Sequence, residues 1–323
     1  MTMKTKKINF LLGIFLFQFI ILNTSLFCQD EFKSNATSGF TFLQIPTTAR
    51  VAALGEASIA LSDMNSEGLF VNPAIIGFTN YTHSFSASYS NWFADIKNYG
   101  TGYTYNSPIG VFGIGFILLD YGSMPRTTSS AGQKVYSVIG SFDANSIAAG
   151  LTYSKMLTDR FSVGVTLKYV QEKIDIYKAD NILFDGGVIY HTGFHSLRIA
   201  ATIHNFGTNT KFINDEFKMP ATFKLGFAAE VFGDNESEYK GTMIFEASHP
   251  NNSDERINLG TEISWRNMLI IRGGYKFFYD EESISLGLGI NPQLDFPMSF
   301  DFAYSDYGRL GNILRFTLQL GMY

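Results

Sequence analysis

The sequence predicts an all-β fold, an outer-membrane antiparallel β-barrel of about 14 strands with an N-terminal hatch or plug segment. Three observations predict it. Apolar and polar residues alternate over many stretches of about ten residues, which is the length of a tilted membrane strand. Aromatic residues make up 15% of the chain and glycine occurs 30 times. After the first 28 residues, no apolar run reaches the ~20 residues that a membrane helix needs.

Residues 1–28 have the pattern of a secretory signal peptide. Lys4, Lys6 and Lys7 precede the apolar run 8–21, and a more polar exit follows. The run is short for a membrane anchor. Cleavage after Cys28 would leave Leu26 at a position where a small residue is expected. A lipidated Cys28 is the other alternative, although Leu26 and Phe27 make a poor lipoprotein signal. We expect export to the outer membrane of a Gram-negative bacterium.

Cys28 is the only cysteine, so the sequence offers no disulfide framework, thiol nucleophile or cysteine metal site.

Residues 29–80 differ from the rest of the mature chain. The runs 49–55 and 57–61 are short and rich in small residues, and Asn72, Pro73 and Ala74 end them at a turn. Such a composition suits packing inside a lumen, where backbone approaches backbone closely. We therefore predict a hatch at 29–80 followed by a single barrel domain at 81–323. An N-terminal cap on a soluble domain is the alternative interpretation of this segment.

The barrel domain divides into fourteen strand-like stretches. In chain order these are residues 82–92, 98–107, 111–121, 146–157, 161–175, 181–191, 197–206, 221–232, 239–249, 256–265, 268–279, 283–290, 298–305 and 312–322. An even number of strands returns the C-terminus to the periplasmic side, as closure by antiparallel pairing of the first and last strands requires. The connections alternate between tight turns and longer loops, with the long ones at 122–145, 174–180 and 207–220.

Ionisable side chains fall on one face of these predicted strands. At 161–169 (FSVGVTLKY), for example, every second residue is apolar and the residues between them are small or polar. A charge on the lipid face at the bilayer midplane costs about 2–4 kcal/mol, so the polar face is expected to line the interior. The lumen-facing polar candidates are Lys168, Arg198, Glu262, Arg272 and Lys276. These charges either line a polar passage or pair with one another or with the plug.

No catalytic motif occurs in the chain. A G-x-S-x-G elbow, an H-E-x-x-H pair, a phosphate loop and a dinucleotide fingerprint are all missing from the sequence. The five histidines are scattered over different strands and turns. The acidic runs 254–255 and 280–282 could bind divalent cations, but solvated loop acids are the favoured interpretation. We expect no enzyme, no cofactor and no metal site. The net charge of −5 also argues against a nucleic-acid partner.

An ordered set of short motifs resembles the PorV/PorQ family of outer-membrane proteins, which is itself similar to FadL-type barrels. The matching runs are 42–45 (FLQI), 49–55 (ARVAALG), 72–74 (NPA), 92–96 (WFADI), 119–122 (LDYG), 157–164 (LTDRFSVG), 204–207 (HNFG), 249–251 (HPN), 255–260 (ERINLG), 272–276 (RGGYK) and 303–311 (AYSDYGRLG). The resemblance covers essentially the whole mature chain. It implies a fourteen-stranded barrel whose hatch contains Asn72, Pro73 and Ala74.

The resemblance also implies a non-enzymatic role in type IX secretion. PorV-like members receive cargo with a C-terminal signal, and PorQ-like members belong to the surface attachment complex, so the expected partners are secretion components, cargo and outer-membrane lipid. The motifs do not distinguish a PorV-like from a PorQ-like member. The loops 122–145 and 207–220 are the candidate partner contacts. The alternative is a FadL-like channel for hydrophobic small molecules, with Asn72, Pro73 and Ala74 in its gate and a kinked strand that opens the wall. A soluble β-sandwich binding module is a third hypothesis.

Overall fold

The computed structural model describes residues 38–129, 136–234 and 236–323 of the chain. These residues belong to a single compact unit that runs from Ser34 to Tyr323. The predicted signal peptide, residues 1–28, and the first part of the predicted hatch lie outside the described residues. Among the described residues, no helix is long and apolar enough to cross a membrane.

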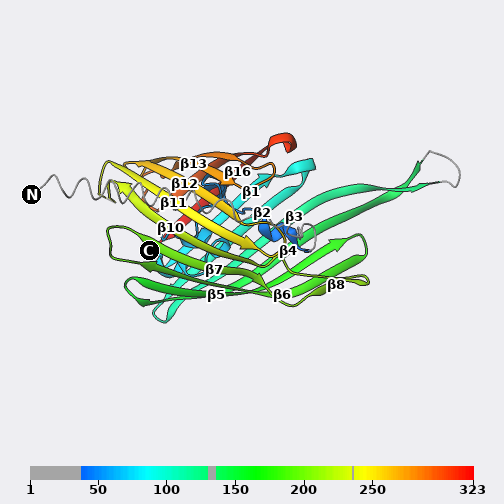
Figure 1. Ribbon diagram of the computed structural model, residues 1–323, viewed down its shortest axis with the longest axis horizontal. Coiled ribbons are helices and arrows are strands. Elements are labelled where there is room, and N and C mark those ends of the chain that lie inside the picture. Colours follow the sequence, from blue (N-terminus) through cyan, green and yellow to red (C-terminus); the bar gives the residue numbers. More distant parts are fainter. Residues whose placement is uncertain (1–37, 130–135, 235) are drawn as a thin grey trace, which may run out of the picture. The chain divides into compact units, whose positions relative to one another are not determined.

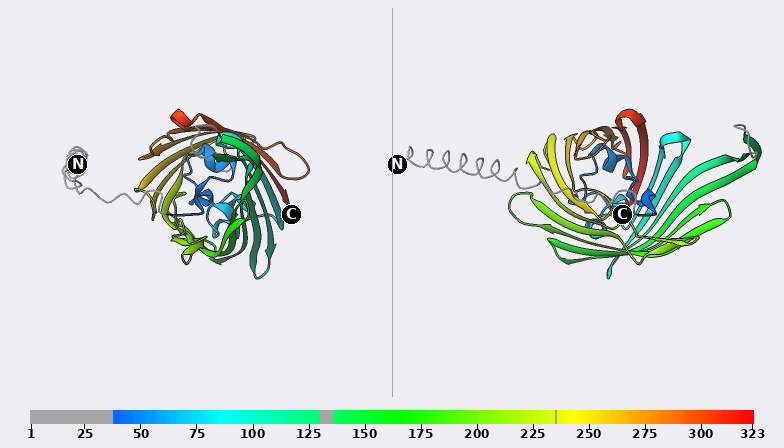
Figure 2. Two further views of the ribbon diagram at one scale, coloured as in Figure 1. Left: turned by 90° about the vertical axis from the view of Figure 1, so that its right-hand side faces the viewer. Right: turned by 45° about the vertical axis from the view of Figure 1, so that its right-hand side comes forward.

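Fourteen antiparallel strands close into a barrel (Figures 1 and 2), which confirms the predicted fold class. Each strand pairs with its neighbour in the sequence, and β1 pairs with β16 to close the ring. The barrel strands are β1 (His83–Asn91), β2 (Lys97–Ser107), β3 (Gly110–Ser129), β4 (Tyr136–Thr158), β5 (Phe161–Ile174), β6 (Tyr177–His191), β7 (Arg198–Phe206), β10 (Thr222–Phe232), β11 (Tyr239–Pro250), β12 (Arg256–Trp265), β13 (Leu269–Phe277), β14 (Ile284–Ile290), β15 (Met298–Asp306) and β16 (Asn312–Met322).

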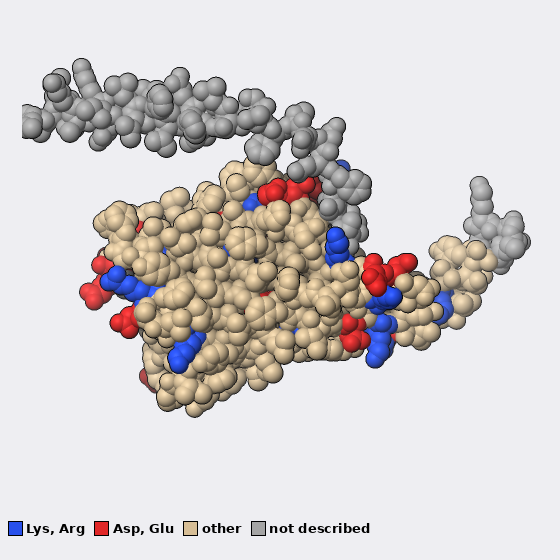
Figure 3. Space-filling view, turned by 60° about the horizontal axis from the view of Figure 1, so that its bottom comes forward, with Lys and Arg blue, Asp and Glu red and all other residues tan. Residues whose placement is uncertain are grey.

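Apolar and polar residues alternate along each strand, and this alternation decides which face of the strand meets lipid. In β5, Val165 and Leu167 are 44% and 56% exposed, whereas Ser162 and Thr166 are buried. On the barrel face that Figure 3 shows, charged side chains gather towards the two ends and leave a broad, largely uncharged middle. An uncharged apolar band between charged rims is what a lipid bilayer requires of a barrel wall.

The predicted connections differ from the structure at one end of the barrel. The expected loop 122–145 is largely a two-stranded ribbon, because β3 and β4 stay paired beyond the rim as far as Ser129 and Tyr136. Strands β5 and β6 are joined by a tight turn at Asp175 and Ile176 in place of the expected longer loop. The loop 207–220 contains a small hairpin of β8 (Thr210–Phe212) and β9 (Asp215–Phe217).

The barrel therefore has two distinguishable ends. The turn end carries the start of β1, the end of β16 and six connections between strands. These connections are β2–β3, β4–β5, β6–β7, β10–β11, β12–β13 and β14–β15. The loop end carries the β3–β4 ribbon and the β8–β9 hairpin. Figure 1 shows the ribbon reaching well beyond the rest of the barrel.

Residues 40–80, the inner segment, lie within the ring of strands (Figure 2, left). The inner segment has little regular structure. Its elements are η1 (Thr41–Gln44), α2 (Ala49–Ala53), η2 (Asn65–Phe70) and η3 (Ile75–Phe78), whereas the 3-10 turns η4 (Phe93–Asp95) and η5 (Gly308–Leu310) belong to barrel connections. Short helices of this kind do not hold together alone, so their stability comes from packing against the wall.

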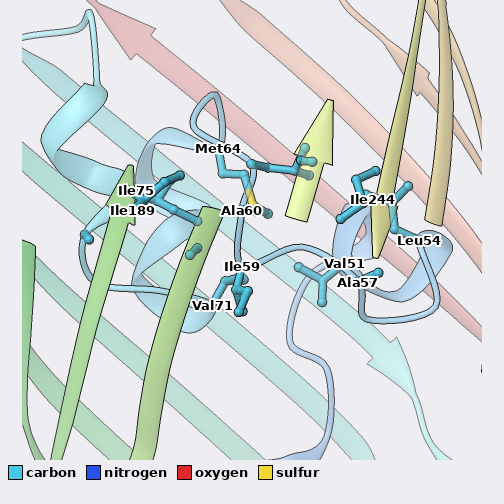
Figure 4. Packing of buried hydrophobic residues seen from close by; sticks show 14 residues of the cluster. Val51, Leu54, Ala57, Ile59, Ala60, Met64, Val71, Ile75, Ile189 and Ile244 are labelled. Atoms are coloured by element: carbon cyan, nitrogen blue, oxygen red, sulfur yellow. The ribbon is translucent and has the colours of Figure 1, made fainter. Parts of the chain in front are cut away.

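The hydrophobic core lies between the inner segment and the wall (Figure 4). Leu54, Ile59 and Ile75 from the inner segment pack with Ile189 of β6 and Ile244 of β11 in the same buried cluster. Glycines at inward positions let the two backbones approach. A Cβ atom on Gly274 of β13 would lie only 2.0 Å from the Gly55 nitrogen.

Candidate functional site

The inner segment separates two sets of cavities inside the barrel. The loop-side cavity has a volume of about 120 Å³. Two turn-side cavities of about 520 and 510 Å³ share Arg50, Asp63 and Glu262 in their linings. The apolar side chains that line the loop-side cavity are Leu43, Ile45, Pro46, Val51, Leu69, Phe70, Val71, Ile117, Ala148 and Pro250. Charged side chains line it as well, namely Glu56, Lys168, Asp185, Lys224 and Arg256. The inner segment contributes side chains to both sets of cavities and lies between them.

Helix α2 forms part of the partition, by which we mean the part of the inner segment that lies between the loop-side and turn-side cavities. Two consecutive residues of this helix line opposite cavities, since Arg50 contributes to both turn-side cavities and Val51 to the loop-side cavity. A helix turns each successive side chain by about 100°, so a polar and an apolar face can sit side by side on one turn. The chamber beyond Val51 combines apolar and charged side chains, and the chambers beyond Arg50 are rich in charged groups.

A chain of buried ion pairs fixes α2 to the wall. The Arg50 Nε atom donates to Glu262 Oε2 at 3.1 Å, and its NH2 group donates to Asp63 at 3.0 Å. The same Glu262 oxygen accepts from Arg272 Nε at 2.6 Å, and Arg272 NH1 reaches Asp301 at 2.5 Å. Arg50, Glu262, Arg272 and Asp301 are all buried. Removing one partner of such a network leaves an uncompensated buried charge, which is strongly destabilising.

A second set of ion pairs holds the segment near Glu56. Lys276 of β13 donates to Glu56 at 2.5 Å and also to Glu282. Burial opposes ionisation of Glu56, but the Lys276 ammonium outweighs it and holds the pKa of this carboxyl below its usual value. On β11, Glu246 accepts from Lys224 at 2.9 Å and from the Ser58 backbone N–H at 2.9 Å. The inner segment is thus bonded to several strands by charged groups.

The wall carries two further pairs. Lys168 of β5 lies 2.7 Å from Asp185 of β6, and its ammonium donates to the Asn205 side-chain oxygen at 2.8 Å. Asp185 also accepts from the Asn205 backbone N–H at 2.7 Å, where the pairing of β6 with β7 shifts register. Arg198 pairs with Glu230 at 2.7 Å.

All five lumen-facing candidates therefore form ion pairs, the four cations with carboxylates and Glu262 with two arginines. Lys168 lines the loop-side cavity, Arg198 lines one turn-side cavity, Arg272 lines the other, and Glu262 lines both turn-side cavities. The sequence did not reveal their partners. Arg50 is the residue with a recognisable signal, since it stands alone among Ala49, Val51 and further alanines. A single charge in an apolar helix requires a buried partner.

The Asn72–Pro73–Ala74 turn docks on strands β5 and β6. The Asn72 amide donates to the backbone oxygens of Ile59 and Val188, and its side-chain oxygen accepts from the Ala74 N–H at 3.0 Å. The Ser162 hydroxyl donates to the Ala74 carbonyl at 2.8 Å. These bonds join the turn to the wall and to the first half of the inner segment. A gating role for the turn stays a prediction.

The turn needs a glycine in the wall opposite it. A Cβ atom at Gly164 would lie 2.3 Å from the Pro73 carbonyl carbon, which is closer than real Cβ contacts allow. We expect Gly164→Ala to displace the turn and to expose the inner segment to proteases at least tenfold faster than in the wild type. Limited proteolysis of the detergent-purified barrel measures this rate. Gly273→Ala is the control, because the nearest atom to its added Cβ is 3.5 Å away. Equal cleavage rates for both variants would contradict the assignment.

Glu67 of η2 is a buried carboxyl that faces the turn-side cavity. Its Oε2 atom has no hydrogen-bond partner among the described residues. Burial, together with the Asp301 carboxylate, raises the pKa of Glu67 from 4.5 to about 7. The folded protein therefore holds a proton here that the unfolded chain has released between these two pH values.

This raised pKa has a defined effect on stability. Because the folded state binds the extra proton, the stability that protonated Glu67 contributes is complete below pH 4.5. This contribution is lost as the pH rises towards about 7. We expect Glu67→Gln to remove this loss, so the variant should exceed the wild type in melting temperature at pH 8 but not at pH 4. Thermal unfolding in detergent checks this, with the exposed Glu255→Gln as control. A wild-type curve that rises with pH and stays parallel to the Glu67→Gln curve would contradict the prediction.

Solved structures show where else this architecture occurs. The Ralstonia pickettii toluene transporter TbuX superposes with a TM-score of 0.61 at 12% identity, covering 85% of this chain and 98% of the transporter. CymD, a monoaromatic hydrocarbon channel, superposes with a TM-score of 0.58 at 9% identity, covering 86% of this chain and 97% of the channel. The Pseudomonas putida toluene transporter TodX superposes with a TM-score of 0.54 at 12% identity, covering 83% of this chain and 96% of the transporter.

The fold is that of a FadL-like outer-membrane barrel. At these identities the likeness concerns the fold alone. Neither a protein-family model nor a curated protein sequence matches the chain. The FadL-like architecture, together with the largely uncharged middle of the barrel face in Figure 3, places the chain in the bacterial outer membrane. The three similar structures are transporters or channels by name. The comparisons give no support to the PorV/PorQ resemblance or to type IX secretion.

Proposed function

We propose that this FadL-like barrel is a channel that takes up small apolar molecules across the outer membrane. The observation that carries the proposal is the apolar part of the loop-side cavity, which is lined by Leu43, Ile45, Val51, Leu69, Phe70, Val71 and Ile117. The charged side chains Lys168 and Asp185 of the same lining are paired with each other. The cavity volume of about 120 Å³ compares with the ~150 Å³ of apolar cavities that bind benzene. A cavity of this size and lining suits a molecule with a single aromatic ring.

The partition inside the lumen fits a gated passage better than a pore. A molecule that enters from the loop end meets Val51, Leu69 and Val71 of the inner segment. Beyond these residues lie the charged turn-side cavities. An apolar ligand gains free energy where it contacts the apolar side chains of the loop-side cavity, so binding is expected beside them. Passage then requires the inner segment to move. The three structural relatives, which carry hydrocarbon or toluene in their names, support the same ligand class.

Uptake by whole cells tests the proposal. The full chain is expressed in a Gram-negative host that lacks hydrocarbon channels, and accumulation of radiolabelled toluene is compared with that of glycerol. We expect toluene uptake to rise several-fold above that of cells with an empty vector, with glycerol unchanged. A parallel rise in both solutes would indicate a nonspecific pore, and no rise in either would remove the proposal.

A role in type IX secretion is the second proposal, and it rests on the PorV/PorQ resemblance. The one structural feature that favours it is the exposed β3–β4 ribbon at the loop end, which could contact cargo or a partner. Deletion of the gene in its host would then remove proteins with type IX C-terminal signals from the medium and the cell surface. An unchanged secretome together with reduced hydrocarbon uptake would decide for the channel.

A further inference from the structure

Arg315 of β16 is the most unusual charged residue of the lumen. Its side chain is fully buried. In the barrel register Arg315 lies opposite Ser90 of β1, and Ser90 in turn lies opposite Asn98 of β2. All three residues are buried at inward positions of their strands. Three neighbouring strands thus bring one guanidinium, one hydroxyl and one amide side by side on the inner wall.

These three side chains leave polar atoms unused. Within the described part of the chain, no hydrogen-bond partner is found for Nε, NH1 or NH2 of Arg315, for the Ser90 hydroxyl or for the Asn98 side-chain oxygen. The Trp92 ring lies 5.8 Å from the Arg315 guanidinium carbon, and the Tyr307 phenol is a close neighbour. Both of these aromatic groups are neutral. The Glu56 and Glu282 carboxylates act on Arg315 at longer range, and both are hydrogen-bonded to Lys276.

The other lumen cations show what is missing. Arg50, Arg272 and Lys276 each pair with at least one carboxylate at 3.1 Å or less. A guanidinium carries five N–H donors and no acceptor, and burying it without a counter-charge costs several kcal/mol. Arrangements of this cost persist when something else supplies the compensating charge.

We propose that Arg315, Ser90 and Asn98 form a binding site for a small monovalent anion, either chloride or a small carboxylate. The Arg315 guanidinium supplies the charge and two or more N–H donors. The Ser90 hydroxyl donates a further hydrogen bond, and the Asn98 amide, after a half-turn that exchanges its oxygen and nitrogen, supplies another. A polyatomic dianion would bring more charge than the single arginine balances. This assignment is independent of the proposed uptake function.

The site lies next to a contact that holds the inner segment. Two residues along β1, the Ser88 hydroxyl donates to the Thr47 carbonyl at 2.6 Å. Two residues along β16, the Thr317 hydroxyl accepts from the Ala49 N–H at 2.8 Å. An anion bound to Arg315 therefore balances a positive charge beside the two hydrogen bonds that hold the start of α2 to the wall. Anion binding is expected to stabilise the assembled barrel as well as Arg315 itself.

Thermal unfolding of the full chain in detergent tests the site in solution. The melting temperature is measured against increasing sodium chloride, bromide or acetate, with sodium gluconate keeping the ionic strength constant. We expect a saturable rise for the wild type and a response that is lost in Arg315→Met. Ser90→Ala should keep the fold and require about tenfold more anion, as expected for loss of one hydrogen bond to a charged group. Arg309→Met changes an exposed arginine and should respond like the wild type.

Crystals of the wild type grown with bromide test the location. We expect an anomalous peak within about 3.5 Å of the Arg315 guanidinium nitrogens, and its loss in Arg315→Met. Acetate that displaces the peak would identify a carboxylate as an equal ligand, whereas a peak that resists acetate would restrict the site to halides. A wild type that responds equally to gluconate and chloride, with no peak beside Arg315, would overturn the proposal. If Arg315→Met fails to fold, Ser90→Ala alone decides the solution test.

Discussion

Replacing Ala148 by phenylalanine is expected to reduce toluene uptake at least tenfold while the barrel stays assembled. Ala148 points inward from β4, is 2% exposed and lines the loop-side cavity. A phenyl ring at this position occupies most of a space of about 120 Å³, so the ligand loses its binding volume. Overpacking of this kind typically costs about 1–3 kcal/mol, which a barrel of this size tolerates.

The adjacent residue provides the matched control for this change. Ala149 has the same side chain but is exposed on the outer face of β4. Ala149→Phe adds the same ring to the lipid side and should leave uptake unchanged. Uptake of radiolabelled toluene is measured in cells with equal amounts of each variant in the outer membrane, and heat-modified mobility on gels verifies folding. Equal uptake by both variants would show that the loop-side cavity does not carry the ligand.

Replacing Glu262 by glutamine is expected to lower the free energy of unfolding by about 3–5 kcal/mol. Glu262 is the centre of the chain of ion pairs, since it accepts from both Arg50 and Arg272. The amide keeps the shape of the side chain but leaves two buried guanidinium groups with less negative charge. Because Arg50 belongs to the inner segment and Glu262 to the wall, the change also loosens the partition. We expect the variant to admit small polar solutes that the wild type excludes.

Two measurements separate these effects. Chemical unfolding in detergent gives the loss of stability, and the rate of glycerol entry into intact cells gives the leak. Thr261→Ala is the control, because Thr261 neighbours Glu262 but lies exposed on the outer face of β12. A variant that unfolds like the wild type and remains closed to glycerol would show that the Glu262 pairs do not hold the inner segment.

The strand phases were predictable because they depend on local sequence alone. In β12 the residues Glu262 and Ser264 face inward and Ile263 and Trp265 face outward, as alternation with period two requires. The same rule placed Arg272 of β13 inside. The partners of these charges were not predictable. Arg50 and Glu262 are far apart in sequence, and only the docking of the inner segment brings them together.

The errors in the sequence prediction also have physical causes. The predicted strand ended at Tyr121, just before Gly122 and Pro125, which are residue types common in turns. In the structure β3 and β4 remain paired through two register shifts, one of which skips Gly122. Bulges of this kind absorb an extra residue without ending a ladder. The cavities could not be foreseen at all, since their volumes depend on how the inner segment is placed.

Function was less predictable than fold. Short motifs indicated the PorV/PorQ family, but the same barrel architecture supports different tasks, and the task is decided by the lumen and the loops. The Asn72 turn illustrates this. Its hydrogen bonds to β6 and to Ala74 explain why these residue types occur there. They do not distinguish a hydrocarbon gate from a structural anchor in a secretion component.

The pairing of β1 with β16 constrains the order in which the protein assembles. This seam joins residues from opposite ends of the barrel domain, such as Phe85 with Leu320. Contacts between remote parts of a chain form slowly, because a large loop must close before any bond rewards it. Ala49 and Met64 of the inner segment also bond to β16. Both the seam and the complete docking of the inner segment therefore require the last strand, so the lumen is partitioned only once the barrel has closed.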